Sequence, residues 1–180
     1  MNGIIRLKHV TDYQKVCYYS VIIDKDDEPI ETANSLFENF VKQQTIDNLE
    51  KLNHILSWLA EIGNRYGAQD RYFRDEQNQG EAMGLPPYAM GRPPVYTEDG
   101  KTAPNNLRLY CHRLNPNVVI LFNGGVKTEA LAQECPNVKT HFLLANQLTK
   151  IIDQAFQNKD IKWINEDTDI DYDNNLILYY

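Results

Sequence analysis

Residues 107–128, LRLYCHRLNPNVVILFNGGVKT, predict the centre of a β-sheet. Leu107–Leu114 alternates between apolar and polar side chains, and Val118–Phe122 is apolar throughout. Asn115-Pro116-Asn117 between them has the residue types of a tight turn. A continuous apolar run is typical of a central strand covered on both faces. We therefore expect a hairpin whose second strand is central and is broken by Asn123-Gly124-Gly125.

The first of these strands is expected to have two different sides, because side chains alternate across a strand. One side carries Leu107, Leu109 and Cys111. The other side, the polar face, carries Arg108, Tyr110 and His112. An exposed face of ordinary polar residues is one explanation. A working face is the other, because a fixed cation, a phenol and an imidazole lie close together and Lys127 follows the partner strand.

The residues before this hairpin predict two strands and two helices. Gly3–Val10 and Lys15–Ile23 are rich in Ile, Val and Tyr, which is typical of a strand hairpin. An apolar stripe within Glu31–Lys42 predicts a short helix. We expect a longer helix from an N-cap at Thr45 to Gly67. Its apolar residues recur at spacings of three and four: Ile46, Leu49, Leu52, Ile55, Leu56, Leu59 and Ile62.

The residues after the hairpin predict one helix and two short strands. Apolar side chains at helical spacing follow Pro136, with Thr140 as a candidate N-cap. Ile161–Ile164 and Leu176–Tyr180 are strand candidates. Between them, residues 165–174 contain five acidic residues and no basic one. We interpret this run as a solvated loop.

Residues 80–104 contain five of the eight prolines and four of the nine glycines. Proline removes amide donors and glycine adds backbone freedom, so no regular element is expected here. Loops of this length inside a domain are usually functional or mobile. The complete order of elements, ββ–α–α–loop–ββ–α–β–β, predicts a single α+β domain over residues 1–180. We expect its helices to pack on one face of a mainly antiparallel sheet.

Composition and charge limit the class of protein. The formal net charge of −7 counts against a surface that binds nucleic acid all round, although Lys101–Thr128 carries four basic residues and no acidic one. No apolar run reaches the length of a membrane span, and the N-terminal residues lack the pattern of a secretory signal. The three widely spaced cysteines indicate reduced thiols in a cytosolic protein.

Several familiar motifs are incomplete. A phosphate-binding loop ending at Lys127 would need glycine at Leu121 and Val126. A calcium loop starting at Asp167 would need glycine at Tyr172 and glutamate at Leu178. Cysteine and histidine do not have zinc-ligand spacing, and no nucleophile elbow is present. The sequence therefore predicts neither a metal site nor a cofactor.

The polar face carries the groups that metal-free RNA cleavage requires. Arginine donates a fork of hydrogen bonds to phosphate oxygens, and His, Tyr or Lys transfers protons. Stabilising the charge of the transition state is the main electrostatic task. The candidate catalytic residues are Arg108, Lys127, His112 and Tyr110. Arg71 and Arg74 could add phosphate contacts. Tyr72 and Phe73 are either stacking surfaces for bases or core residues, and we favour the core.

RYFR at 71–74, LRLYCHRL at 107–114, and VVILFNGG followed by VKT up to Thr128 together resemble the core of RelE/HigB-like bacterial toxins. The motifs are most similar to those of a longer branch of that family, and the resemblance covers residues 46–158. It implies two helices followed by an antiparallel meander with a shallow active-site groove. The family's strand arginine corresponds to Arg108, and its Lys-Thr corresponds to Lys127 and Thr128.

The resemblance implies a ribosome-associated mRNA endoribonuclease that needs no metal and is silenced by a cognate antitoxin, often a helix-turn-helix protein. The candidate RNA contacts are Arg71, Arg74, Lys101, Arg113 and Thr128. The acidic charge, the 80–104 loop, the N-terminal hairpin and the extension at 159–180 depart from the family pattern. The acidic segment could mask the basic face until a target displaces it. The alternative is a non-catalytic module that keeps the toxin-like fold and holds a protein partner through its loop and acidic tail.

Overall fold

The computed structural model describes residues 3–24, 32–76, 82–88 and 93–180. Its helices are α1 (Leu36–Asp47), α2 (Leu49–Glu61) and α3 (Lys139–Gln157). A π-helical turn, Ile62–Tyr66, extends α2, and short 3-10 turns lie at Asp70–Tyr72 and Ala132–Glu134. The strands are β1 (Ile4–Asp12), β2 (Cys17–Asp24), β3 (Arg74–Asp75), β4 (Met83–Leu85), β5 (Thr97–Glu98), β6 (Lys101–Thr102), β7 (Leu107–Asn115), β8 (Val118–Val126), β9 (Ile161–Ile164), β10 (Asp169–Tyr172) and β11 (Leu178–Tyr179).

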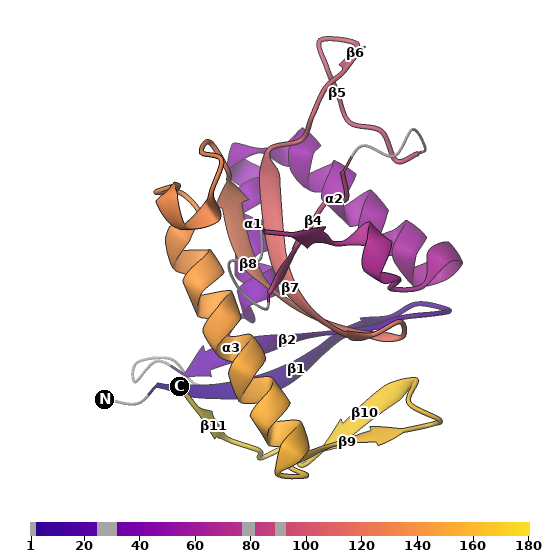
Figure 1. Ribbon diagram of the computed structural model, residues 1–180, viewed down its shortest axis with the longest axis vertical. Helices are drawn as coiled ribbons and strands as arrows, with labels where there is room; N and C mark the ends of the chain where they lie inside the picture. Colours follow the sequence, from indigo (N-terminus) through magenta and orange to yellow (C-terminus); the bar gives the residue numbers. More distant parts are fainter. Residues whose placement is uncertain (1–2, 25–31, 77–81, 89–92) are drawn as a thin grey trace.

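One seven-stranded sheet organises the fold, with the strand order β11-β1-β2-β8-β7-β4-β3 (Figure 1). The pairing of β2 with β8 is parallel, and the other pairings of this sheet are antiparallel. The predictions of an α+β class, a mainly antiparallel sheet and a central β8 are therefore confirmed. The β1–β2 and β7–β8 hairpins also form as expected. None of the described helices has the length and apolar character needed to cross a membrane.

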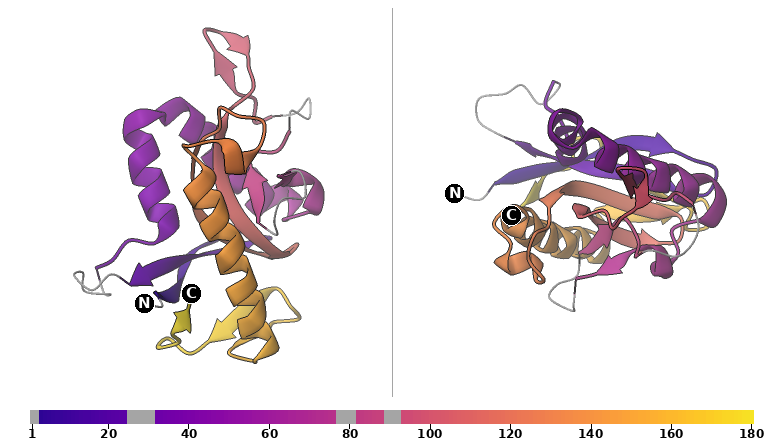
Figure 2. Two further views of the ribbon diagram at one scale, coloured as in Figure 1. Left: turned by 60° about the vertical axis from the view of Figure 1, so that its left-hand side comes forward. Right: turned by 90° about the horizontal axis from the view of Figure 1, so that it is seen from above.

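The helices cover both faces of the sheet, so the prediction that they pack on one face is wrong (Figure 2). The apolar face of α2 and part of α1 pack with Leu107, Leu109 and Cys111. Helix α3 packs against the opposite face, where it meets Tyr110 and Ile120. The physical reason is that both faces of β8 are apolar and each needs a cover.

Helix boundaries differ from expectation because other caps fix them. Ser35 and Glu38 form a reciprocal capping box, so α1 begins at Leu36. Thr45 is not an N-cap; it lies inside α1, where its hydroxyl donates to the Val41 carbonyl at 2.6 Å. Ile46 is consequently 82% exposed and lies off the buried stripe. Thr140 is likewise inside α3, which starts after the buried Val138 without a side-chain cap.

Three segments expected to be irregular contain strands. Strand β8 continues through Gly124 and Gly125, because a side chain at Gly124 would lie 1.8 Å from the Arg108 carbonyl oxygen and only glycine allows that approach. The 80–104 loop supplies β4 to the main sheet and the β5–β6 hairpin. The acidic run supplies β10, which pairs with β9. Strand β4 forms through a long-range pairing with β7, which local composition does not encode, whereas β5–β6 and β9–β10 are local hairpins.

Candidate functional site

The polar face of β7 is part of the protein interior. Arg108 is 8% exposed and Tyr110 is fully buried. The Tyr110 ring packs on Phe142 of α3 with the ring centroids 5.3 Å apart. The side-chain alternation predicted for this strand is therefore confirmed, but Arg108 and Tyr110 do not lie on an open surface.

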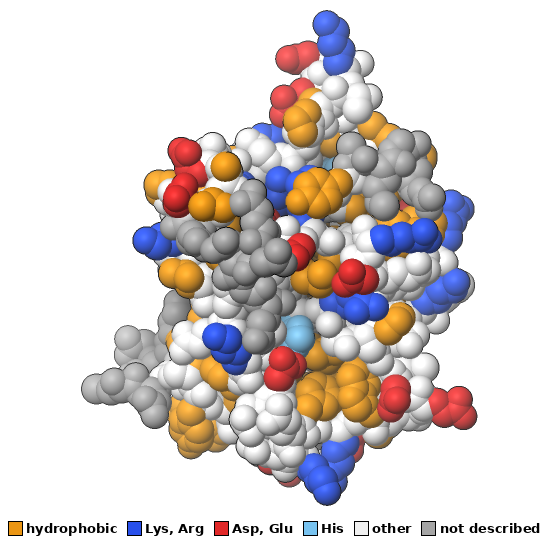
Figure 3. Space-filling view, in the orientation of Figure 1, with side chains coloured by type: hydrophobic (Ala, Val, Ile, Leu, Met, Phe, Trp, Pro, Cys, Tyr) orange, Lys and Arg blue, Asp and Glu red, His pale blue; other side chains and the backbone are white. Residues whose placement is uncertain are grey.

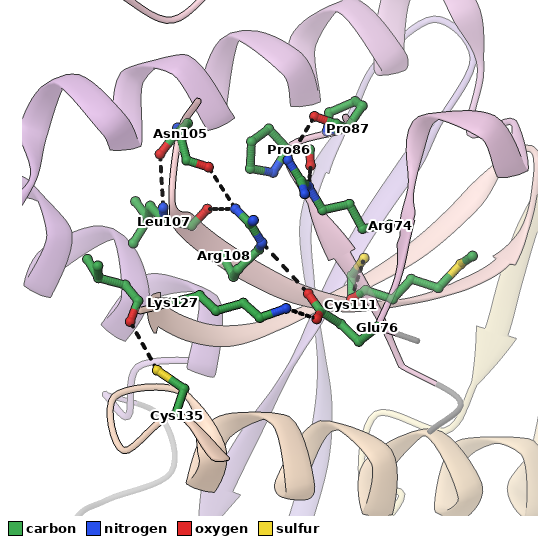
Figure 4. A network of polar contacts seen from close by, with 12 residues as sticks. Arg74, Glu76, Pro86, Pro87, Asn105, Leu107, Arg108, Cys111, Lys127 and Cys135 are labelled. Carbon is green, nitrogen blue, oxygen red and sulfur yellow. Dashed lines mark hydrogen bonds and ion pairs between the residues drawn. The ribbon is translucent and has the colours of Figure 1, made fainter. Parts of the chain in front are cut away.

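Glu76 is a carboxylate that pairs with the cations of this region. Together with Arg108 and Lys127 it forms the Glu76 cluster, which joins the residue after β3 to β7 and to the residue after β8 (Figure 4). Lys127 Nζ donates to Glu76 Oε2, and Arg108 Nε lies 3.7 Å from Oε1. The exposed fractions of the three side chains are only 4–12%. The two cations share one buried carboxylate. Because Glu76 lies far from both of them in the sequence, this pairing was not predicted.

Burial dominates the electrostatics of the cluster. Burial and the neighbouring charge of Arg74 lower the pKa of Arg108 to about 10, although Glu76 opposes the shift. The guanidinium also donates through one terminal nitrogen to the carbonyls of Asn105, at 2.7 Å, and Leu107, at 3.1 Å. Burial, followed by the Glu76 charge, raises the pKa of Tyr110 far above its usual value. At neutral pH the phenol is therefore a poor proton donor.

The remaining catalytic candidate faces a different partner. His112 Nε2 lies 2.7 Å from Asp153 Oδ1, on α3. Arg113, on the same strand, donates to the Ala68 carbonyl. The structure therefore brings Arg108 and Lys127 together with Tyr110 nearby, but it directs His112 towards a separate carboxylate.

The candidate RNA contacts do not converge on one surface. Arg71 lies over the ring of the adjacent Tyr72, and Arg74 lies over Tyr88 and donates to the Pro86 carbonyl at 2.6 Å. Lys101 is exposed in the β5–β6 hairpin. Thr128 contacts Cys135, its amide nitrogen lying 3.3 Å from the sulfur. The core position expected for Tyr72 and Phe73 is confirmed, with 0% and 6% exposure.

The acidic segment does not mask Arg108. Its hairpin lies at the opposite end of the molecule from β5 and β6 (Figure 1). There the Tyr19 hydroxyl donates to Asp169 at 2.5 Å, and Asn115 donates to the Asp167 carbonyl at 2.7 Å. The suggestion that the tail covers the basic face is therefore wrong, because Glu76 provides the counter-charge.

A pocket of about 190 Å³ opens beside the Glu76 cluster, and most of its wall comes from the 80–104 loop. This loop pocket is lined by residues 86–88, 94–96 and 102–105, together with His54, Trp58 and Arg74. Its rim includes Tyr88 and Val95, which are 60% and 51% exposed. In Figure 3, orange hydrophobic and blue basic side chains lie together below the projecting β5–β6 hairpin. An apolar pocket with a few polar groups is the usual form of a small binding site.

Asn105 links the loop pocket to the Glu76 cluster. Its backbone carbonyl accepts from Arg108, while its side-chain amide contacts His54 Nδ1 at 3.0 Å. Burial lowers the pKa of His54. The Trp58 indole nitrogen lies 3.2 Å from His54 Nε2. A polar chain therefore runs along the base of an otherwise apolar pocket.

Glu76, His54 and Trp58 were not among the residues predicted for a site. Glu76 follows Arg74 by two residues, so strand alternation could have placed both on one side. His54 and Trp58 are four residues apart on the best-defined helix, which puts them on one helical face. The signals were present, but nothing local showed that the 80–104 loop would fold over them.

Cys135 is the thiol with the most distinctive surroundings. Burial raises its pKa, but hydrogen bonds from the Thr128 hydroxyl and from the backbone of Thr128, Asn137 and Glu129 outweigh burial and lower it to about 7.

Within the described residues, no group of three or more His, Cys, Asp or Glu side chains is placed to hold a metal ion.

No family model, curated protein or solved structure matches the chain. The resemblance of residues 46–158 to RelE/HigB-like toxins therefore stays a proposal carried by the sequence motifs.

Proposed function

We propose that this protein is a non-catalytic binding module that holds a protein partner in the loop pocket. The observation that carries the proposal is the pocket itself, an apolar and aromatic hollow whose rim residues Tyr88 and Val95 are exposed. Large exposed apolar side chains around a concave site are typical of interaction surfaces. The net charge of −7 also fits a protein partner better than a polyanion.

The burial of the β7 polar face supports the same proposal. An endoribonuclease must bring a phosphodiester to its cations, yet Arg108 and Lys127 are already ion-paired with Glu76 and are largely inaccessible. Ion-paired, buried cations of this kind usually have a structural role. The loop pocket, in contrast, is open.

Site-specific photo-cross-linking tests the proposal. A benzophenone amino acid replaces Tyr88 at the pocket rim in one variant and Leu143, 49% exposed on α3, in a control variant. Irradiation in the native cells should give one discrete protein adduct at position 88, and the double substitution Val95→Glu with Thr102→Glu should abolish it. Adducts of equal yield at both positions, or none at position 88, would contradict the proposal.

A second candidate function is the toxin-like, metal-independent mRNA endoribonuclease, and one observation favours it. Glu76 Oε1, Arg108 Nε and the Tyr110 hydroxyl are buried without hydrogen-bond partners. Unsatisfied polar atoms grouped in this way often mark a site that another molecule completes. With a phosphodiester in place, Glu76 would accept the 2′-hydroxyl proton, the 2′-oxygen would attack phosphorus as its bond to the 5′-oxygen breaks, and the protonated Glu76 would return the proton to the departing 5′-oxygen. Arg108 and Lys127 would stabilise the phosphate charge.

Induced expression tests this second candidate. The endoribonuclease proposal predicts growth arrest with the wild type and normal growth with the Arg108→Ala plus Lys127→Ala variant. Immunoblotting must show equal soluble protein for both. Normal growth with the wild type, in the absence of an antitoxin, would remove the endoribonuclease from consideration.

A further inference from the structure

The orientation of the Asn105 side chain is fixed by its backbone neighbours. Its Oδ1 accepts from the Leu107 amide at 2.9 Å, and its Nδ2 donates to the Lys51 carbonyl at 3.0 Å. Rotating the amide by half a turn would break both hydrogen bonds. The group that Asn105 presents to His54 Nδ1, at 3.0 Å, is therefore an N–H donor.

This donor determines the tautomer of His54. A neutral imidazole has one N–H and one acceptor nitrogen. Since Nδ1 accepts from Asn105, the proton resides on Nε2, which lies 3.3 Å from the Pro94 carbonyl oxygen and donates to it. Burial lowers the pKa of His54, which keeps the ring neutral at pH 7.

The tautomer leaves the Trp58 indole N–H without an acceptor. Trp58 Nε1 approaches His54 Nε2 at 3.2 Å, but both nitrogens carry a hydrogen. Among the described residues, no other contact supplies this indole with an acceptor. Trp58 is only 2% exposed and lines the loop pocket. A buried donor without a partner is costly, so a ligand that supplies an acceptor gains affinity.

The pocket has few free acceptors to offer in return. The carbonyls of Pro86 and Pro87 accept from Arg74, and the Pro94 carbonyl accepts from His54. The Tyr96 carbonyl accepts from the Ala103 amide at 3.1 Å. With these four carbonyls engaged, the matching ligand brings a hydrogen-bond acceptor and a ring-sized apolar group and depends little on donors of its own.

Proline-rich peptide has this chemistry. Proline has no N–H, its carbonyl is an acceptor, and aromatic-lined sites bind the extended polyproline conformation. A volume of about 190 Å³ suits a ring, since an apolar cavity of about 150 Å³ takes benzene. We propose that the loop pocket binds a proline-containing extended segment of its partner, with a proline ring in the pocket and a peptide carbonyl accepting from Trp58 Nε1–H. This inference rests on the proposed binding function.

A nucleobase is the competing occupant. Bases also stack on aromatic side chains, but their exocyclic amines and ring N–H groups need acceptors. The engaged carbonyls of the pocket supply few, and the acidic chain repels the phosphate backbone. The observations therefore favour the peptide, and the base becomes an outcome of the test.

Titration of the ¹⁵N-labelled full chain with an N-acetylated decaproline amide tests the inference directly. Trp58 and Trp163 are the two tryptophans, so only two indole N–H signals exist. The Trp58 signal should move downfield and saturate, while the Trp163 signal stays in place. A Gly-Ser decamer, with an N–H at every residue, should produce no saturable shift. A decaproline titration without a saturable Trp58 shift overturns the inference.

Two variants separate the hydrogen bond from the shape of the pocket. Trp58→Phe keeps an aromatic ring and removes the N–H, so decaproline affinity should fall about three- to tenfold. Tyr88→Ala, at an exposed rim position, should weaken binding without disturbing the core. Trp163→Phe is the matched control and should bind as the wild type does. Undiminished binding by Trp58→Phe overturns the assigned hydrogen bond. A saturable Trp58 shift with decauridylate and none with decaproline overturns the peptide as the occupant.

The two proposals can fail separately. A protein adduct at position 88 without decaproline binding leaves the binding function in place and removes only the peptide chemistry. Decaproline binding without any adduct at position 88 shows a competent pocket that does not hold a protein partner in the cell.

Discussion

The Glu76 cluster and the loop pocket are neighbours linked by Asn105, yet they differ in access. The cluster side chains are 4–12% exposed, whereas Tyr88 and Val95 on the pocket rim are more than half exposed. The cluster contains the residues that chemical reasoning selected from the sequence, and the pocket is formed by the loop that was expected to be irregular. Reactive residue types therefore indicate function only where a ligand can reach them.

The largest expected effect is the loss of folding stability when a carboxylate charge is removed from the Glu76 cluster rather than from the pocket. Glu76→Gln preserves shape but leaves Arg108 and Lys127 buried without a counter-charge, so unfolding should become easier by about 3–5 kcal/mol. Glu98→Gln, near the pocket, removes a 3.7 Å ion pair to Lys51 whose glutamate is 49% exposed, and should cost at most about 1 kcal/mol. Urea denaturation measures both. Equal losses would show that the cluster is not the stabilising region.

Glycine substitutions make a second contrast. A Cβ at Gly124 meets the Arg108 carbonyl at 1.8 Å and must push β7 from β8, so Gly124→Ala should cost about 3 kcal/mol. A Cβ at Gly100, in the β5–β6 turn, meets nothing within 4 Å, but its φ of +76° is strained for alanine. Gly100→Ala should therefore cost only about 1 kcal/mol. Thermal unfolding of the two variants measures this order. A lower unfolding temperature for Gly100→Ala than for Gly124→Ala would refute it.

Replacing the entire cluster sharpens the comparison. In the triple variant Glu76→Met, Arg108→Met and Lys127→Met, no charge is left unpaired, and a buried ion group exchanged for apolar side chains is often neutral or stabilising. The free energy of unfolding should lie within about 1 kcal/mol of the wild type or above it. Loss of folding in this variant would mean that the charges themselves specify the structure.

The smallest expected effect is a pH dependence that arises at the pocket. Burial lowers the pKa of His54 below its usual value, so its contribution to stability is complete above about pH 6.5 and is lost as the pH falls through the folded-state pKa. His141, also partly buried, contributes in the same direction because burial lowers its pKa as well. Urea unfolding at pH 7 and pH 5.5 should show this loss. His54→Gln and His141→Gln should each reduce it, and a pH slope unchanged in both variants would contradict the assignment.

Local patterns predicted the hairpins, α2, α3 and β9, because each has a strong period or composition of its own. The start of α1 is also encoded, in the capping box of Ser35 and Glu38, although the apolar stripe alone predicts an earlier start at Glu31. Strand β4 could not be predicted, since its pairing with β7 is a long-range choice. Helices cover the second face of the sheet because both sides of β8 are apolar, and this apolar run is visible in the sequence.

The candidate site was harder to predict than the fold. Arg108 and Lys127 were correctly placed near each other, but their carboxylate lies 32 and 51 positions away in the chain. The Trp58 donor is unpaired only because of the His54 tautomer. That tautomer is set by Asn105 and Pro94, which lie about 40 or more positions further along the chain. Whether a polar group finds a hydrogen-bond partner depends on the packed structure, and the periodic patterns of the sequence do not predict it.

The central claim is that the accessible loop pocket binds the partner and that the buried Glu76 cluster has only a structural role. Mapping of mRNA 5′ ends in a translating extract tests it most directly, with the triple methionine variant as the folded control. The account predicts that the wild type produces no cuts beyond those seen with that variant. Cuts made by the wild type and absent with the triple variant would contradict the account and establish the Glu76 cluster as a catalytic site.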